Sequence, residues 1–213
     1  MAQNWVQRSA QISTISQILF AIASFVGFLA PKQNDFLAIL LMLDIVIQII
    51  ELAFYAIFVY YKQLPTVYRY IDWYITTPIQ LISNIALLSF FDDNTITLTD
   101  FTKDSESEII AIFVLNFVML SFGLMAEIYP SYKYVLVTLG MLPFITQFMI
   151  IYYKYAINTN LGLIINTYVC ILWFLYGIEA YLDYDRKNIM YNILDVFAKN
   201  FYGLFVSVYI FYI

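Results

Sequence analysis

The sequence contains no histidine, one cysteine and few charged residues, and each shortage excludes a class of protein. Without histidine there can be no histidine-ligated metal or haem site and no histidine acid–base catalysis. The single Cys170 excludes an intrachain disulfide, and its place in an apolar run favours a buried free thiol. The net charge of −5 argues against nucleic acid as a partner.

Apolar surface is present in excess of what a soluble domain of this size can hide. Of the 213 residues 63% are hydrophobic and 12% are charged, and the mean hydropathy is +0.79. A spanning helix needs about 20 apolar residues, so the chain has room for roughly seven spans with short connections. We therefore expect an integral, multi-pass membrane protein with a single seven-helix domain over residues 1–213. No basic segment precedes the first apolar run, so we expect that run to be retained rather than cleaved.

Seven apolar stretches, separated by polar or turn-forming residues, favour this all-α architecture. The expected helices cover residues 11–30, 37–61, 68–91, 109–126, 132–153, 161–182 and 190–212. Between the third and fourth, residues 92–108 hold six carboxylates and one lysine, which predicts an acidic loop in water. Residues 30–35 are expected to form a turn, and the polar residues 183–188 are expected to connect the last two helices.

The orientation in the membrane is weakly marked. Five basic residues fall on the side of the N-terminus, and three fall on the other side: Arg8, Lys62, Lys133, Arg186 and Lys187 against Lys32, Lys103 and Lys154. The positive-inside rule therefore favours a cytoplasmic N-terminus by a small margin. The 20 tyrosines, many of them near span ends, fit an interfacial aromatic belt.

Ionisable side chains inside the expected spans are the main functional signal, because each costs about 2.5–3.5 kcal/mol on insertion scales. Asp195 and Lys199 are four residues apart and share one helix face. Lys199 is the only lysine in mid-span, and two nearby carboxylates would keep its nitrogen charged, as an ammonium or as a protonated imine. A purely structural ion pair is the alternative. The full set is Asp44, Glu51, Arg69, Asp72, Asp195 and Lys199.

Three segments of the chain stand out as motifs: RYIDWYITTP at residues 69–78, LWFLY at 172–176 and LDVFAK at 194–199. They resemble the helix C, F and G signatures of the microbial (type 1) rhodopsins. Asp72, Thr76 and Ser83, together with Glu51 and Asn200, are closest to the viral rhodopsins of giant algal viruses.

The resemblance implies that Lys199 carries all-trans retinal as a Schiff base, with Asp72 and Asp195 as its counterion and Arg69 on their extracellular side. It also implies an extracellular N-terminus, against the small charge margin. The retinal pocket implied in this way comprises Trp73, Thr76, Thr77, Gln80, Met119, Gly123, Gly140, Phe144, Trp173 and Tyr176.

Several details of the pocket depart from the family or refine it. Gly177 stands where most relatives have proline and Ala180 where many have tryptophan, so helix F is either repacked locally or loosened. Thr77 is expected to face Asn116 across two helices. Gln80 occupies a colour-tuning position, and a polar amide there predicts blue or blue-green absorption with a red shift in Gln80→Leu.

A proton pump is one of three functions that remain open. Asp72 can accept a proton, but Ser83 occupies the usual donor position and cannot be a rechargeable acid near neutral pH, which argues against fast pumping. Asp183 and Asp185 are candidates for external release, while Lys187 stands where an acid is common. A photosensor that acts through a partner is also open, although the sequence has no transducer-like extension.

A light-gated cation channel is the leading prediction, with a slow outward proton pump second. Glu51 and Asn200 resemble the central gate of channelrhodopsins, Ser13 or Ser16 would complete it, and Asp44 resembles a further acidic position of the pathway. Carboxylates and amides there can replace part of a cation's hydration shell. A simpler interpretation is that Glu51 only forms hydrogen bonds to neighbouring helices.

The expected partners follow from these interpretations. They are membrane lipid, retinal, and cations or protons as transported ions, with a homo-oligomer left open. The sequence has no catalytic triad, phosphate loop or metal-ligand cluster, so an enzyme is not expected.

Overall fold

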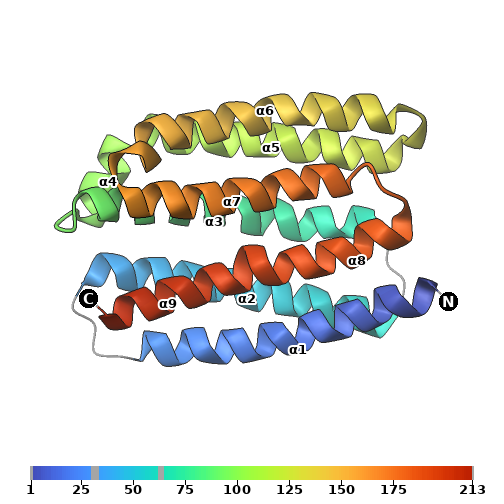
Figure 1. Ribbon diagram of the computed structural model, residues 1–213, viewed down its shortest axis with the longest axis horizontal. Helices are drawn as coiled ribbons and strands as arrows, with labels where there is room; N and C mark the ends of the chain where they lie inside the picture. Colours follow the sequence, from blue (N-terminus) through green and yellow to red (C-terminus); the bar gives the residue numbers. More distant parts are fainter. Residues whose placement is uncertain (1, 30–33, 62–64, 213) are drawn as a thin grey trace.

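The structure, a computed structural model, describes residues 2–29, 34–61 and 65–212, with side chains for 5–29, 34–61 and 65–209, and its long elements are helices. In Figure 1, α5 and α6 form one side of the bundle, α3 and α7 lie in the middle, and α1, α2 and α8–α9 form the other side. The elements are α1 (Ala2–Phe28), α2 (Asp35–Tyr61), α3 (Arg69–Asp92), α5 (Glu106–Ile128), α6 (Lys133–Lys154), α7 (Asn160–Glu179), and α8 (Tyr184–Asp195), η4 (Val196–Phe201) and α9 (Tyr202–Tyr212) in direct succession.

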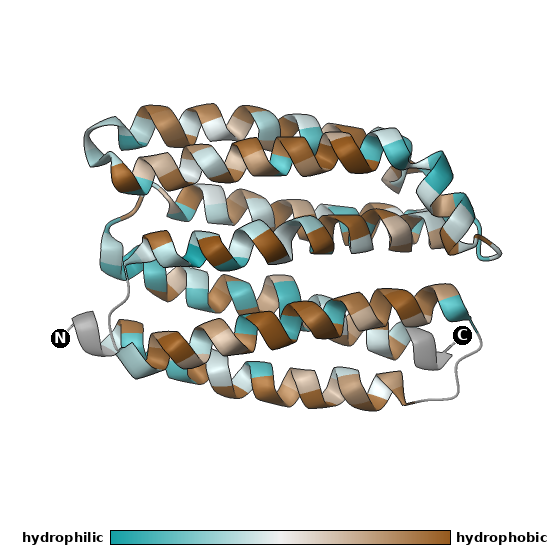
Figure 2. Cartoon of the chain, turned by 180° about the vertical axis from the view of Figure 1, so that it is seen from behind, coloured by the Kyte–Doolittle hydropathy of each residue, from teal (hydrophilic) through white to brown (hydrophobic). Residues whose placement is uncertain are grey.

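The outer surface of the bundle is apolar and its interior is partly polar, which is the reverse of a soluble protein. Figure 2 shows hydrophobic residues along the middle of the helices and hydrophilic residues gathered towards their ends. Among the described residues, six helices are long and apolar enough to cross a membrane. The succession α8–η4–α9 forms the seventh segment, and its first half is polar. The chain is therefore an integral, multi-pass membrane protein, as the composition predicts.

The acidic segment between the third and fourth spans contains a helix that the sequence did not lead us to expect. Helix α4 covers Leu98–Asp104, and its N-cap Thr97 accepts a hydrogen bond from the backbone N–H of Asp100. Phe101 is buried against Phe36, with ring centroids 5.9 Å apart, and this contact folds the segment back onto the bundle. Its carboxylates still face water, except Glu108, which is half-buried beside Lys154.

Three expected boundaries were wrong by several residues. Helix α1 begins at Ala2 rather than at residue 11. In these added turns the polar side chain of Ser9 accepts a hydrogen bond from Asn192 on α8, so the segment stays packed on the bundle as a helix. Helix α7 ends at Glu179 rather than 182. Helix α8 begins at Tyr184, within the polar stretch expected to be a connection, and Asp183 caps it by accepting from the Arg186 N–H. The expected end of the first helix at residue 30, most of the 30–35 turn, Lys32 and Lys62 lie outside the described residues.

Candidate functional site

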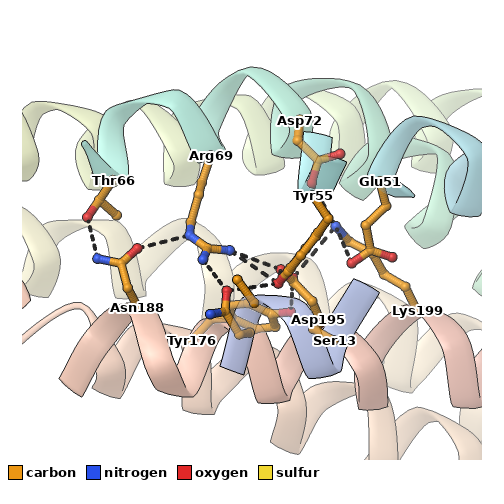
Figure 3. A network of polar contacts seen from close by, with 12 residues as sticks. Ser13, Glu51, Tyr55, Thr66, Arg69, Asp72, Tyr176, Asn188, Asp195 and Lys199 are labelled. Carbon is orange, nitrogen blue, oxygen red and sulfur yellow. Dashed lines mark hydrogen bonds and ion pairs between the residues drawn. The ribbon is translucent and has the colours of Figure 1, made fainter. Parts of the chain in front are cut away.

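Lys199 lies in η4 with its amine enclosed by carboxylates from three helices (Figure 3). The nitrogen is 2.9 Å from Asp72 Oδ2, 3.5 Å from Glu51 Oε1 and 3.7 Å from Asp195 Oδ1. All four side chains belong to residues no more than 4% exposed. A buried amine needs such partners, because removing a cation from water is costly. The third carboxylate is new relative to the sequence analysis, which assigned Glu51 to a separate gate.

Asp72 and Asp195 differ in how their carboxylates are occupied. Asp195 accepts from Tyr176 Oη at 2.6 Å, from Tyr55 Oη at 2.7 Å and from the Arg69 guanidinium at 3.2 Å. Asp72 accepts from Lys199, and its Oδ1 has no hydrogen-bond partner among the described residues. The carboxylate of Asp72 is therefore the less saturated of the two.

Tyr55 is a site residue that the sequence analysis missed. Its hydroxyl joins Asp195, Asn192 at 3.1 Å and Arg69 at 3.4 Å. One signal could have identified it, because Tyr55 is four residues beyond Glu51 on α2 and so lies on the same helix face.

Arg69 is held by two asparagines from α8 that were also missed. Its Nε donates to Asn188 Oδ1 at 3.0 Å and its Nη2 contacts Asn192 Oδ1. Asn188 in turn donates to Thr66 at 3.0 Å, and Asn192 donates to Ser9 at 2.8 Å. The two asparagines are four residues apart, but Asn188 falls in the polar stretch expected to connect two helices and Asn192 in the expected last helix, so the sequence did not place them on one helix face. This network connects Arg69 to α1, α2 and α8.

The residues assigned to a channel-like gate are all near the centre of the bundle, but no hydrogen bond joins them in the described part of the chain. Asn200 Nδ2 reaches the Asp195 carbonyl at 3.5 Å, and Ser13 accepts from Gln17 at 3.2 Å. Ser13 is 2% exposed and lies in the cluster of Figure 3, whereas Ser16 is only half-buried. Both oxygens of Glu51 lack a hydrogen-bond donor.

Asp44 and Ser83 meet although they belong to different helices. The Ser83 hydroxyl donates to Asp44 Oδ1 at 3.4 Å, and both residues are 3% exposed or less. Along α2 the order is Asp44, Glu51 and Tyr55. Glu51 contacts Lys199 and Tyr55 contacts Arg69, so Asp44 lies on the opposite side of Lys199 from Arg69.

An apolar cavity borders Lys199. Ten of its lining residues were singled out in the sequence for the pocket: Trp73, Thr77, Gln80, Met119, Gly123, Gly140, Phe144, Trp173, Tyr176 and Lys199. Gly177 and Ala180, the departures in helix F, also line it. Thr76 does not line the cavity, and its hydroxyl donates to the Asp72 backbone carbonyl at 3.0 Å. The expected contact between Thr77 and Asn116 is present at 2.8 Å.

The glycines of the cavity wall permit close packing. A Cβ atom on Gly123 would lie 2.7 Å from Tyr70 Oη, and one on Gly177 would lie 2.9 Å from Met141 Sδ. The residues present fit a long apolar aldehyde such as retinal. Lys199 offers the amine that can form an imine, carboxylates can balance a cationic nitrogen, and aromatic walls can enclose a polyene.

Near the expected acids Asp183 and Asp185 there is a buried ion pair between Lys187 and Glu127. Lys187 lies 2.5 Å from Glu127, and both side chains are largely buried. Asp183 is exposed, and the backbone N–H of Arg186 lowers the pKa of its carboxyl below the usual value. Glu127 was not identified from the sequence, because it lies at the end of α5, on a different helix from Lys187.

The chain matches the model of the bacteriorhodopsin-like protein family over residues 8–212, and no curated protein matches it significantly. The viral rhodopsin OLPVRII has a similar structure, with a TM-score of 0.86 at 23% identity over 96% of each chain. Blue light-absorbing proteorhodopsin from Med12 gives 0.80 at 21% identity over 98% of each chain. The proton-pumping rhodopsin AR2 from the marine alga Acetabularia acetabulum gives 0.74 at 20%, over 98% of this chain and 97% of that one.

These neighbours share the fold, and the family match spans nearly the whole chain. With a buried lysine among carboxylates beside an apolar cavity, the protein belongs to the bacteriorhodopsin-like family, the microbial rhodopsins, which are membrane proteins that carry a retinal chromophore.

Proposed function

We propose that this protein is a light-driven outward proton transporter in which Lys199 binds all-trans retinal and Asp72 accepts the proton. The observation that carries the proposal is the 2.9 Å contact between the Lys199 nitrogen and an otherwise unsaturated Asp72 carboxylate. Retinal, when bound to Lys199, supplies light absorption and a change of shape. The remaining steps are proton transfers between side chains of this chain.

Asp72 is favoured over Asp195 as the acceptor because of their different surroundings. Asp195 already accepts three hydrogen bonds, which fix its position. A proton arriving at Asp195 would compete with these donors for the lone pairs of the carboxylate. A proton arriving at Asp72 displaces nothing, so Asp72 takes the proton and Asp195 remains a fixed negative charge.

Asp44 supplies the missing proton donor. The sequence analysis doubted fast pumping because Ser83 stands at the usual donor position and cannot release a proton. In the bundle the carboxylate of Asp44 is 3.4 Å from that serine, so an acid is available from α2 instead of α3. Asp44 is about 10 Å along the helix axis from Glu51, and water or side chains must relay the proton over that distance.

The direction of transport follows from the order of these groups. Arg69 contacts Asn192, which donates to Ser9 in the first part of α1, and Asp44 lies on the other side of Lys199. With the N-terminus outside, protons leave past Arg69 and enter from Asp44. The proposal includes this orientation.

A light-gated cation channel is the second candidate, and unpaired buried oxygens favour it. Glu51 Oε1 and Oε2, Asn200 Oδ1 and Gln17 Oε1 have no hydrogen-bond donor among the described residues. Such oxygens can substitute for the hydration shell of a cation. We place the channel second because Glu51 lies 3.5 Å from Lys199 and forms no hydrogen bond with Asn200 among the described residues.

Photocurrents under controlled voltage and ion gradients separate the two functions. A pump gives outward current without any gradient, and Asp72→Asn abolishes it while Asp93→Asn, in the exposed acidic segment, leaves it unchanged. A channel gives current that reverses with the cation gradient and is reduced in Glu51→Ala. Currents that reverse with the gradient and survive Asp72→Asn would refute the pump.

A further inference from the structure

The helix that carries Lys199 is interrupted by the π-helical turn η4, and its backbone hydrogen bonds are shifted there. In a regular α-helix the N–H of Tyr202 would donate to the Ala198 carbonyl. Here the Tyr202 N–H donates to the Lys199 carbonyl, three residues earlier instead of four. A π-turn contains an extra residue, so carbonyl groups in it need donors from elsewhere when they are buried.

Two side chains from two neighbouring helices supply such donors. Gln80 on α3 donates its amide N–H to the Ala198 carbonyl, and Tyr168 on α7 donates its hydroxyl to the Phe197 carbonyl at 2.7 Å. Gln80 is 1% exposed, and its own carbonyl oxygen has no partner among the described residues. Its contact with Ala198 is therefore the main polar interaction that holds this amide.

We propose that Gln80 and Tyr168 are positioning residues that brace η4 from two sides and so keep Lys199 aligned with Asp72. The inference rests on the proposed function, because it assumes that the Lys199 nitrogen moves during a photoreaction and must return. The Ala198 carbonyl and the Lys199 Cα belong to the same planar peptide unit, so a shift of one moves the other. A turn that has lost one brace samples misaligned positions, and the amine returns to Asp72 more slowly.

The test compares Gln80→Leu, Tyr168→Phe and the double variant, each loaded with all-trans retinal, by the recovery of visible absorbance after a flash. Each single variant is expected to recover about fivefold more slowly, the factor that corresponds to a hydrogen bond of roughly 1 kcal/mol. Because both residues act on one turn, the double variant should fall short of the product of the two effects. Tyr181→Phe is the matched control, since its hydroxyl pairs with Thr138 and not with η4.

Infrared difference spectra give a second readout that general destabilisation would not produce. With ¹³C at the alanine carbonyls, the Ala198 band should shift in Gln80→Leu and stay in place in Tyr168→Phe. With ¹³C at the phenylalanine carbonyls, the Phe197 band should show the opposite pattern. Tyr168→Phe removes one hydroxyl from a half-buried side chain, so its pigment is expected to form even where that of Gln80→Leu does not.

If the visible absorbance of Tyr168→Phe recovers at the wild-type rate, the proposed positioning role is wrong. Gln80 would then act only as a dipole beside the cavity. Unshifted carbonyl bands in both variants would overturn it as well. Failure of the proposed function would give a different result. Either the wild-type protein would form no pigment with retinal, or its pigment would give no photocurrent. In the second case the recovery kinetics would still respond to both substitutions.

Discussion

Replacing Asp44 with asparagine removes the proposed proton donor while leaving its surroundings almost unchanged. Asparagine has nearly the same size, and its side-chain oxygen can still accept the 3.4 Å hydrogen bond from Ser83. Asp44 is buried and forms no ion pair among the described residues, so the substitution leaves no cation unpaired. We therefore expect Asp44→Asn to fold and to bind retinal, and the change should be confined to the return of the proton.

The magnitude follows from how a proton would otherwise arrive. A positioned acid typically contributes a factor of about 10² to 10⁴ to proton transfer. Without it, bulk protons at about 10⁻⁷ M and a diffusional limit of about 10⁹ M⁻¹s⁻¹ allow at most about 10² s⁻¹ at pH 7. That ceiling falls tenfold for each pH unit. Recovery of Asp44→Asn should therefore slow steeply with rising pH, whereas recovery of the wild-type protein should stay nearly flat from pH 6 to 8.

Flash absorbance measurements over that pH range provide the assay, and a small permeant acid such as azide should restore the rate of the variant. Asp93→Asn is the control, because Asp93 is exposed in the acidic segment and outside the spans. The hydroxyl and N–H of Thr95 hold the pKa of the Asp93 carboxyl below its usual value, so it remains ionised and donates no proton across this range. A flat pH profile in Asp44→Asn, with wild-type recovery, would refute the donor role.

Four further outcomes are expected. Lys199→Ala should show no visible absorbance with retinal, because the imine cannot form. Glu51→Gln should keep its pigment but lose a neutral-carboxyl infrared band. Glu51, Asp72 and Asp195 are three carboxylates, whereas the cations beside them among the described residues are Lys199 and Arg69. One carboxyl is therefore expected to be neutral, and we expect it to be that of Glu51. Gln80→Leu should shift absorbance to the red, since the amide no longer stabilises charge near the nitrogen; an unshifted spectrum would count against this. Lys187→Met should lower the free energy of unfolding in detergent by about 2 kcal/mol, because it leaves Glu127 without its partner. Adding Glu127→Leu to this variant should restore much of the loss in a thermal-unfolding measurement.

The sequence by itself determined the membrane class, the seven helical segments and the central lysine. Apolar runs of spanning length have one stable solution in lipid, so segment number can be read along the chain. A lysine in mid-span is costly, and Asp195 one turn away on the same helix is a partner that helical periodicity alone identifies. The family motifs added Asp72, whose carboxylate does contact the amine.

Only the tertiary structure decided which side chains from different helices meet. Glu51 reaches Lys199, and Asp44 reaches Ser83, because of how α2 is rotated against its neighbours. Helical spacing shows which residues of one helix share a face, but not which partner that face will have. For this reason the sequence favoured a gate at Glu51 and found no donor for a pump.

The shape of the chain around Lys199 also required the structure. The π-turn η4 has no signature in the pattern of apolar and polar residues, since one extra residue in a turn changes the register of backbone hydrogen bonds and not the composition. Its stability depends on Gln80 and Tyr168, which are far away in the sequence. The lysine is thus specified by the chain, whereas its alignment with Asp72 is specified by packing.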